Sequence, residues 1–144
     1  MSDASVDPQE MSQQLQVLQA QIQELTRERE TLRATIEDIG GAIDALERLE
    51  SGSTVQVPLG GNAYVRATIE DIDEVLVDIG GGFSAERSRE GAIDTLEERQ
   101  STVEGRVEAI TERLGELESE TGDLERQLQQ VVAAQQQQQR SFEG

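Results

Sequence analysis

The sequence predicts an α+β fold in which a long antiparallel two-helix coiled coil holds two β-hairpins between its helices. Apolar residues at heptad spacing run along residues 11–50 and again along 89–134, a pattern typical of helices that pair along one stripe. Between these stretches, residues 53–87 change to a period of two, which is typical of strands. Two glycine-rich turns divide that segment into hairpins and return the chain upon itself, so the two helices are expected to pair with each other.

The first helix is predicted over residues 11–50, where apolar residues follow one another in alternating steps of four and three. Isoleucine is favoured at the a positions of the heptad and leucine at the d positions, and we call this stripe the first seam. Arg29 interrupts it. Gly40 and Gly41 each cost about 1 kcal/mol in a helix interior, so the sequence indicates either a local bend near the hairpins or a tolerated irregularity.

The second helix is predicted over residues 89–134, with a second seam of valine, isoleucine and leucine that Gln100 and Thr121 interrupt. Together with the arginine of the first seam, these polar residues are expected to fix the register of the coiled coil at some cost in stability. The flanking segments, residues 1–10 and the glutamine-rich residues 135–144, are predicted to be disordered.

Residues 53–87 are predicted to form four short antiparallel strands with one predominantly apolar face. The stretches that begin at Val57 and Val77 match at an offset of twenty residues, which makes them two hairpins of one kind. Four short strands with few large side chains are not stable alone. They form either a self-contained cap on the coiled coil or, as we favour, a platform whose edges and apolar faces join other subunits. The residues predicted for this oligomerisation are Val55, Val57, Leu59, Tyr64, Val65, Ile69, Val75, Val77, Ile79 and Phe83.

The hexapeptide ATIEDI occurs twice, at residues 34–39 and 67–72, and its neighbours predict two different structures for it. In the first copy, Ile36 and Ile39 continue the first seam, which favours a helix. In the second copy, Ile69 continues an alternating strand and the acidic residues after it form a turn. Local propensity is a weak guide to secondary structure, and the surrounding pattern decides.

The composition argues against an enzyme. The chain has neither cysteine nor histidine, which excludes disulfides, thiolate zinc sites and thiol catalysis and removes the commonest general base. Its apolar content of 35% includes two phenylalanines and one tyrosine, thin material for a compact core. The carboxylates of residues 70–74 match no Ca²⁺-binding loop, and paired catalytic carboxylates need a concave, partly dry site. We predict no catalytic residue, no metal site and no cofactor.

The charge of the chain points to a salt-rich cytoplasm. The net charge is −18, and all twelve basic residues are arginine. Such self-repulsion is screened near 1 M salt, where the Debye length falls to about 3 Å. The alternative is an ordinary acidic coiled coil, which usually carries lysine at its flanking positions. Nucleic acid and membrane partners are not expected, because they need basic patches, and neither a bilayer-spanning run nor a signal peptide is recognisable.

These features together resemble the alpha subunits of archaeal prefoldin, in a halophilic form. The resemblance covers residues 11–131, and its most specific part is the VPLG stretch from Val57, followed by the pair Tyr64 and Val65 and a second glycine-rich hairpin. Two hairpins are similar to the alpha class, whereas the beta class carries one. The sequence departs from the family at Gly81, where alanine is common, and in its acidic, lysine-free surface.

The resemblance implies a molecular chaperone that works without ATP. It implies a hexamer of two alpha and four beta subunits, in which the hairpins form a double β-barrel platform and the coiled coils extend from it. It further implies that the coiled-coil tips capture unfolded polypeptides and pass them to a group II chaperonin. The alternative function from the fold alone is a coiled-coil scaffold or adaptor that binds folded partners.

The apolar residues farthest along the helices from the hairpins are the candidates for client binding. Helix ends fray and then expose their apolar residues, which could bind apolar segments weakly and many times over. In the alternative, these residues only close the coiled coil, and clients bind in a cavity of the platform. The candidates are Met11, Leu15, Leu18, Ile22, Leu124, Leu128 and Val131.

Overall fold

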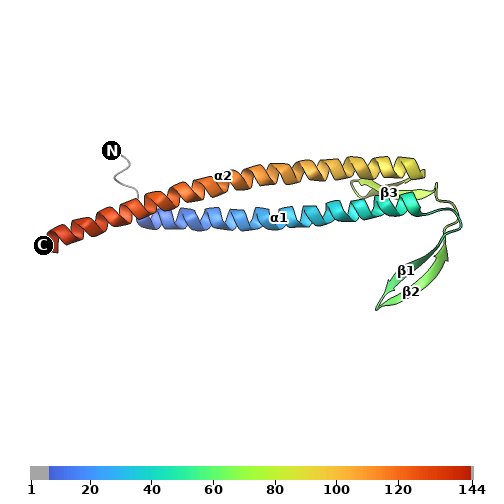
Figure 1. The fold of residues 1–144 in the computed structure, drawn as a ribbon, viewed down its shortest axis with the longest axis horizontal. Helices are drawn as coiled ribbons and strands as arrows, with labels where there is room; N and C mark the ends of the chain where they lie inside the picture. The colour runs from blue at the N-terminus through green and yellow to red at the C-terminus, as the bar shows by residue number, and fades with distance from the viewer. Residues whose placement is uncertain (1–6, 144) are drawn as a thin grey trace. The chain divides into compact units, whose positions relative to one another are not determined.

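The computed structural model describes residues 7–143, with side chains as far as Arg140. Along the chain, four strands lie between two long helices. The predicted α+β class with two hairpins between the helices is confirmed (Figure 1). The predicted disorder of residues 1–6 and of Gly144 lies outside the described residues. The elements are α1 (Pro8–Arg48), β1 (Thr54–Gly60), β2 (Ala63–Thr68), β3 (Val75–Gly80), β4 (Phe83–Arg87) and α2 (Arg89–Glu143).

The chain divides into two compact units, each of which takes part of both helices. The helical unit comprises described residues 7–31 and 106–143. The hairpin unit comprises residues 32–105 and contains all four strands.

In the helical unit, the two helix segments run antiparallel along their predicted seams. Glu28 of α1 pairs with Arg106 of α2 at 2.9 Å, and Leu18 lines a groove together with Glu120, so residue numbers rise on one helix as they fall on the other. The buried side chains belong to the seams, as their heptad spacing requires. They are Met11, Ile110, Leu114 and Leu117.

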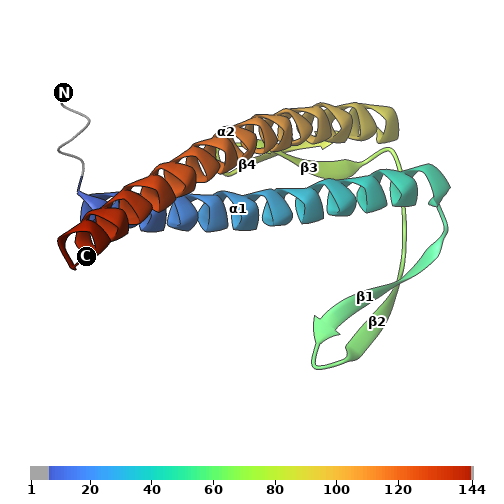
Figure 2. The same ribbon diagram turned by 60° about the vertical axis from the view of Figure 1, so that its left-hand side comes forward.

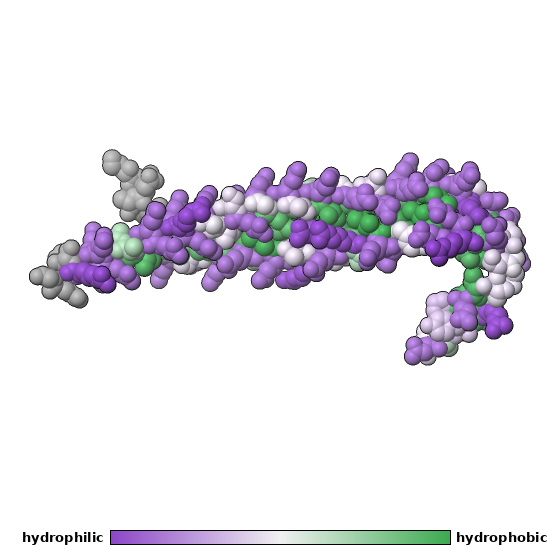
Figure 3. All heavy atoms as spheres, viewed as in Figure 1, coloured by the Kyte–Doolittle hydropathy of each residue, from purple (hydrophilic) through white to green (hydrophobic). Residues whose placement is uncertain are grey.

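In the hairpin unit, the helix segments are again antiparallel. The amide of Gln100 donates a hydrogen bond of 3.2 Å to the carbonyl oxygen of Ile36, and Arg89 at the start of α2 bonds to Leu49 just after α1. Ile39, Ile43 and Ala92 are buried there. The space-filling view shows hydrophobic residues gathered between the helices and hydrophilic residues over their outer faces (Figure 3).

The four strands form two separate two-stranded antiparallel sheets, β1–β2 and β3–β4. Within the hairpin unit, the second hairpin lies along the helix segments, whereas the first stands apart from them in both ribbon views (Figures 1 and 2). Val77 of β3 is 6% exposed, and its cross-strand partner Ala85 is half-buried. Within residues 7–143 the strands do not close into a barrel.

The two hairpins have the same turn, as their twenty-residue repeat predicts. In each, a register shift precedes a turn whose residues adopt positive φ, the conformation that suits the right-handed twist of the flanking strands. Asn62 stands at φ 63°, and asparagine tolerates this region better than other side chains do. The glycines of the two turns are Gly60, Gly61, Gly80, Gly81 and Gly82, at φ 100°, 58°, 103°, 62° and 79°.

The helix boundaries differ from the predicted ones at both ends of the chain. We predicted disorder through residue 10, but α1 begins at Pro8, because Asp7 Oδ1 accepts the N–H of Gln9 at 3.0 Å and proline suits the first helical position. We also predicted a structureless tail from residue 135, but α2 continues to Glu143. Glutamine and alanine have high helix propensity, so nothing in this tract ends the helix.

Gly40 and Gly41 lie inside α1, which continues through them without a break. A Cβ atom at Gly40 would lie 3.5 Å from Nε2 of Gln100, the amide that bonds to Ile36. An alanine at Gly40 would therefore make an ordinary van der Waals contact with the side chain that crosses from α2. At Gly41, a Cβ atom would meet nothing within 4 Å.

Gly41→Ala is therefore expected to stabilise the chain. Alanine is about 1 kcal/mol more favourable than glycine in a helix interior, and the added methyl group points into open space. The midpoint of denaturant unfolding in molar salt measures the change. Gly40→Ala is the matched comparison, and a similar gain is expected there, since its methyl group would make only an ordinary contact with the Gln100 amide. A loss of stability at either position would contradict this account.

Candidate interaction surfaces

The first hairpin carries apolar side chains on both of its faces, and they are exposed. Val57 pairs with Val65 on one face, and Pro58 pairs with Tyr64 on the other. Their exposure is 40% for Val57, 47% for Val65 and 59% for Tyr64, and Leu59 beside them is 68% exposed. A two-stranded ribbon with so little burial is marginal by itself. Within its own chain, this hairpin therefore leaves most of its apolar side chains uncovered.

Two residues predicted for oligomerisation, Val55 and Ile69, lie at the base of the first hairpin and are less exposed than the other predicted residues of that hairpin. Val55 and Ile69 are half-buried. Ile69 lies just beyond β2, and its N–H and carbonyl bond to the carbonyl of Ser53 and the N–H of Gly52 at 2.9 and 2.7 Å. These bonds extend the ladder toward the helices.

The second hairpin uses one face within its own chain. Val77 is buried and Val75 half-buried on the face that packs in the hairpin unit, while Ile79 lines a groove with Thr95 and Arg99 of α2. Phe83, also predicted for oligomerisation, is 71% exposed.

The sequence analysis did not select Leu76, which is the most exposed large apolar residue of the hairpins at 74%. Leu76 lies opposite Glu86, and Val77 lies opposite Ala85, so the two neighbours belong to different faces of the sheet. The period of two predicted that they diverge, but it carries no information on which face meets the helix.

All seven candidate residues for client binding lie in the helical unit. Met11 is 3% exposed and therefore packs inside the coil. The other six, Leu15, Leu18, Ile22, Leu124, Leu128 and Val131, are half-buried.

Two exposed valines of the helical unit were not among these candidates. Val17 is 57% exposed and Val132 is 39% exposed. Val17 precedes the seam residue Leu18 and lines the same groove, together with Gln21. Each valine directly adjoins a residue of the seam, so heptad spacing alone places it outside the coil interface.

The three polar residues of the seams behave differently from one another. Arg29 Nη1 donates to Thr111 Oγ1 across the helical unit at 3.3 Å, and Gln100 bonds across the hairpin unit. Thr121 Oγ1 donates instead to the carbonyl of Leu117 in its own helix at 2.7 Å. The predicted role in register is thus supported for Arg29 and Gln100, which would lose a bond if the helices slipped.

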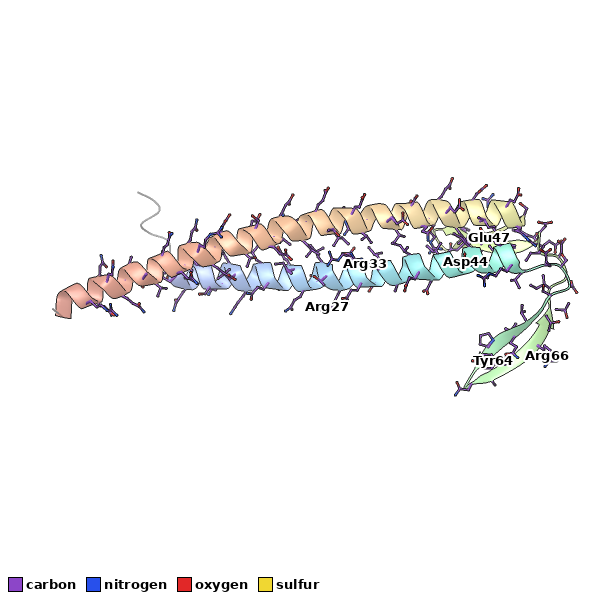
Figure 4. All side chains as sticks on the ribbon, in the orientation of Figure 1. Arg27, Arg33, Asp44, Glu47, Tyr64 and Arg66 are labelled. Atoms are coloured by element: carbon purple, nitrogen blue, oxygen red, sulfur yellow. The ribbon has the colours of Figure 1, made fainter. Side chains whose placement is uncertain are left out.

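Arg29→Met is expected to stabilise the helical unit by about 1 kcal/mol. Arg29 Nε is buried and has no hydrogen-bond partner among the described residues, and an unsatisfied buried donor costs about 1–3 kcal/mol. Methionine replaces the apolar stem of the arginine and carries no donor that needs a partner. The unfolding midpoint measures the change, and Arg27→Met, at an exposed position labelled in Figure 4, is the control with no expected gain. A loss of stability in Arg29→Met would contradict this account.

Acidic side chains dominate the outer faces, among them Asp44 and Glu47 in Figure 4. Of the ion pairs within residues 7–143, two join segments that are distant along the chain: Arg89 with Glu50, and Arg106 with Glu28. In the same part of the chain, no three carboxylates lie where they could share a metal ion, and neither helix has the length of apolar sequence that crossing a bilayer requires. Most of the negative charge therefore has no cationic partner on the surface.

Comparison with known proteins identifies the relatives of this architecture. The family model described as prefoldin subunit matches residues 18–134. The prefoldin subunit alpha of Haloarcula marismortui is 58% identical over 83 residues, which are 58% of this chain and 54% of that protein. The alpha subunit of Methanospirillum hungatei is 31% identical over 137 residues and 89% of each chain. The match to the haloarchaeal relatives spans about half of their length.

Solved structures resemble this fold as well. The cryo-EM structure of filamentous PFD from Methanocaldococcus jannaschii has a TM-score of 0.67 at 30% identity, and the match covers 76% of this chain and 93% of that one. The prefoldin beta subunit of Thermococcus strain KS-1 is 19% identical with a TM-score of 0.59, over 86% and 90% of the two chains, and supports the fold alone. The sequence match and the shared arrangement of helices and hairpins agree, and the chain belongs to the prefoldin family.

Proposed function

We propose that this chain is the alpha-type subunit of a prefoldin chaperone that captures non-native polypeptides without ATP and delivers them to a group II chaperonin. The observation that carries the proposal is that both hairpins of this prefoldin-family chain expose apolar side chains. A single chain leaves that surface uncovered. The acidic, lysine-free composition supports a salt-rich cytoplasm as its location.

Assembly with a beta subunit is the first part of the proposal. Val57, Tyr64 and Leu59 on the first hairpin, and Leu76 and Phe83 on the second, offer apolar contacts whose burial would stabilise a complex by about 25 cal/mol per Å². The stoichiometry of two alpha and four beta subunits is the one that the family resemblance implies. The hairpins would then close into barrels that remove their exposed edges.

Client capture by the helical unit is the second part. Its half-buried seam residues become accessible when the coil frays, and Val17 and Val132 are accessible already. Each contact is weak, but several coiled coils on one platform act together, so that avidity replaces a deep pocket.

Reconstitution tests the function as a whole. The chain is mixed with a prefoldin beta subunit in molar salt, and the complex is added to several unrelated denatured proteins as they are diluted from denaturant. Suppressed aggregation of all of them supports the chaperone. A complex that forms but suppresses none would favour the scaffold or adaptor instead. Polymers formed by the chain alone would favour a filament, as in the protein from Methanocaldococcus jannaschii.

The location of client binding is tested by two sets of substitutions. The double variant Val17→Ser with Val132→Ser removes the exposed apolar side chains without touching the seam, and Ala20→Ser with Ala133→Ser is the exposed, matched control. Triple substitution of Leu124, Leu128 and Val131 by serine removes seam residues. Reduced client capture with intact assembly in the valine double variant and in the triple variant supports the helical unit as the site. Unchanged client capture in both of these variants would place the site in the platform.

A further inference from the structure

Arg89 is the first residue of α2, a position where a positive charge is locally unfavourable. The free N–H groups at the start of a helix carry partial positive charge, which acidic residues stabilise and basic residues do not. The helix already has a conventional cap, because Ser88 Oγ accepts the N–H of Gly91 at 3.1 Å. The reason for an arginine at this position must therefore lie outside α2.

The side chain of Arg89 reaches the end of α1. Its Nη2 donates a hydrogen bond of 2.5 Å to the carbonyl oxygen of Leu49 and lies 3.5 Å from a carboxylate oxygen of Glu50. Carbonyls at the end of a helix carry partial negative charge and lack partners within the helix. The Arg89 side chain is 20% exposed, so this charge-assisted contact is largely shielded from solvent.

The main chain of Arg89 holds a second segment. Its N–H donates to Oδ1 of Asp73 at 3.3 Å, and Asp73 belongs to the link between β2 and β3. The Asp73 N–H in turn donates to Oδ1 of Asp71 at 2.9 Å, which orders that link. The side chain of Arg89 thus bonds to the segment that enters the first hairpin, and the backbone N–H of Arg89 bonds to the segment that leaves it.

At the base of the first hairpin, the segment that enters it and the segment that leaves it are hydrogen-bonded to each other. Ser51 Oγ accepts the N–H of Ile72 at 3.1 Å, in addition to the ladder bonds between residues 52–53 and Ile69. Toward α1, however, this base is attached through residues 49–52, which include Gly52 at φ 92°. In the described part of the chain, Arg89 supplies the side-chain hydrogen bond that joins this attachment to α2.

We propose that Arg89 is a positioning residue that fixes the direction in which the first hairpin leaves the helix pair and so presents it to the partner subunit. The proposal rests on the assembly proposed above. If the hairpin adopts the productive direction in only a fraction of the molecules, the apparent affinity for the partner falls by that fraction. Loss of the Arg89 side chain should therefore weaken assembly even though that side chain contacts no partner.

A distance measurement tests this directly in the full-length chain. Because the chain has no cysteine, Glu47→Cys on α1 and Arg66→Cys on β2, both exposed and labelled in Figure 4, can carry a pair of spin labels. We expect a narrow distribution of label distances with Arg89 present and a broad one in Arg89→Ala. Assembly of Arg89→Ala with a prefoldin beta subunit should be about tenfold weaker, as expected if about a tenth of the hairpins point correctly.

Three further variants make the test specific. Arg89→Lys keeps a cationic donor and should recover part of the narrow distribution and of the affinity. Arg126→Ala, at an exposed arginine of the same helix far along the chain from the hairpins, should change neither. If Arg89→Ala loses helicity, Arg89→Met, which keeps the aliphatic part of the side chain but removes the donor to Leu49, should still broaden the distribution measurably. A distribution that is broad with Arg89 present, or unchanged in a folded Arg89→Ala, would overturn the proposal. Failure of the unsubstituted chain to assemble would refute the proposed function and leave the distance result valid.

Discussion

Leu76→Ser is expected to weaken assembly by about 30-fold or more while the free chain stays as stable as before. Leu76 is 74% exposed in the single chain, so serine there removes little internal contact. In a complex, the same leucine would be buried, and burial of a leucine side chain contributes about 1.5–3 kcal/mol. Truncation at a well-packed interface position typically costs at least about 2 kcal/mol of binding.

Val77→Ser is expected to lower the stability of the chain itself and to abolish assembly as a consequence. Val77 is 6% exposed within its own chain, so the substitution leaves a cavity and buries a hydroxyl group. The second hairpin should be destabilised by about 2 kcal/mol or more, and assembly should fail because the hairpin no longer packs correctly.

Two measurements separate these variants. Denaturant unfolding of the chain alone reports stability, and sedimentation of mixtures with a beta subunit over a dilution series reports assembly. Glu86→Ser, on the strand position opposite Leu76, is the control for the same face without an apolar contact. If Leu76→Ser assembled as tightly as the unsubstituted chain, the outer face of β3 would not be an interface.

Transfer from molar to about 0.1 M salt is expected to unfold the chain or dissociate its complex. The net charge is −18, and few of the carboxylates have an arginine partner in the described part of the chain. At about 1 M salt the Debye length is about 3 Å, and at about 0.1 M it is about 10 Å, which lets neighbouring carboxylates along each helix repel one another. Helicity measured as a function of salt concentration should show a cooperative loss as salt falls.

A charge variant distinguishes screening from other effects of salt. Replacing Glu37, Asp44 and Glu47 by their amides removes three exposed carboxylates of α1 with little change in shape. The salt concentration at the midpoint should fall, because less repulsion then needs screening. Ser12→Asn with Gln16→Asn, uncharged exposed positions of the same helix, should leave it unchanged. A midpoint that does not move in the amide variant would contradict the electrostatic explanation.

The elements of this fold are readable from the sequence because each has its own period. Heptad spacing places α1 and α2, and alternation with paired glycine turns places both hairpins. The two copies of ATIEDI confirm the rule: residues 34–39 lie in α1, whereas Ala67 and Thr68 end β2. The ends of the helices were harder to predict. From the sequence, disorder is predicted for the segment around Asp7 and for the glutamine tract. A capping aspartate and a run of glutamines both favour a helix.

The interaction surfaces were only partly readable. Alternation separates Leu76 from Val77, and heptad spacing separates Val17 from Leu18, but neither pattern says which side another element covers. That depends on packing between segments distant in sequence, where burial of apolar area outweighs any local preference.

The sequence by itself determined the period of each element, the turns between them, the charge, and the antiparallel return of the second helix. The tertiary structure alone decided which strand face stays exposed and what Arg89 does. Read locally, Arg89 is a cation at the wrong end of a helix dipole. Only the fold brings the carbonyl of Leu49, just after α1, and the carboxylate of Glu50 beside it, because electrostatic partners act through distance in space and not through separation along the chain.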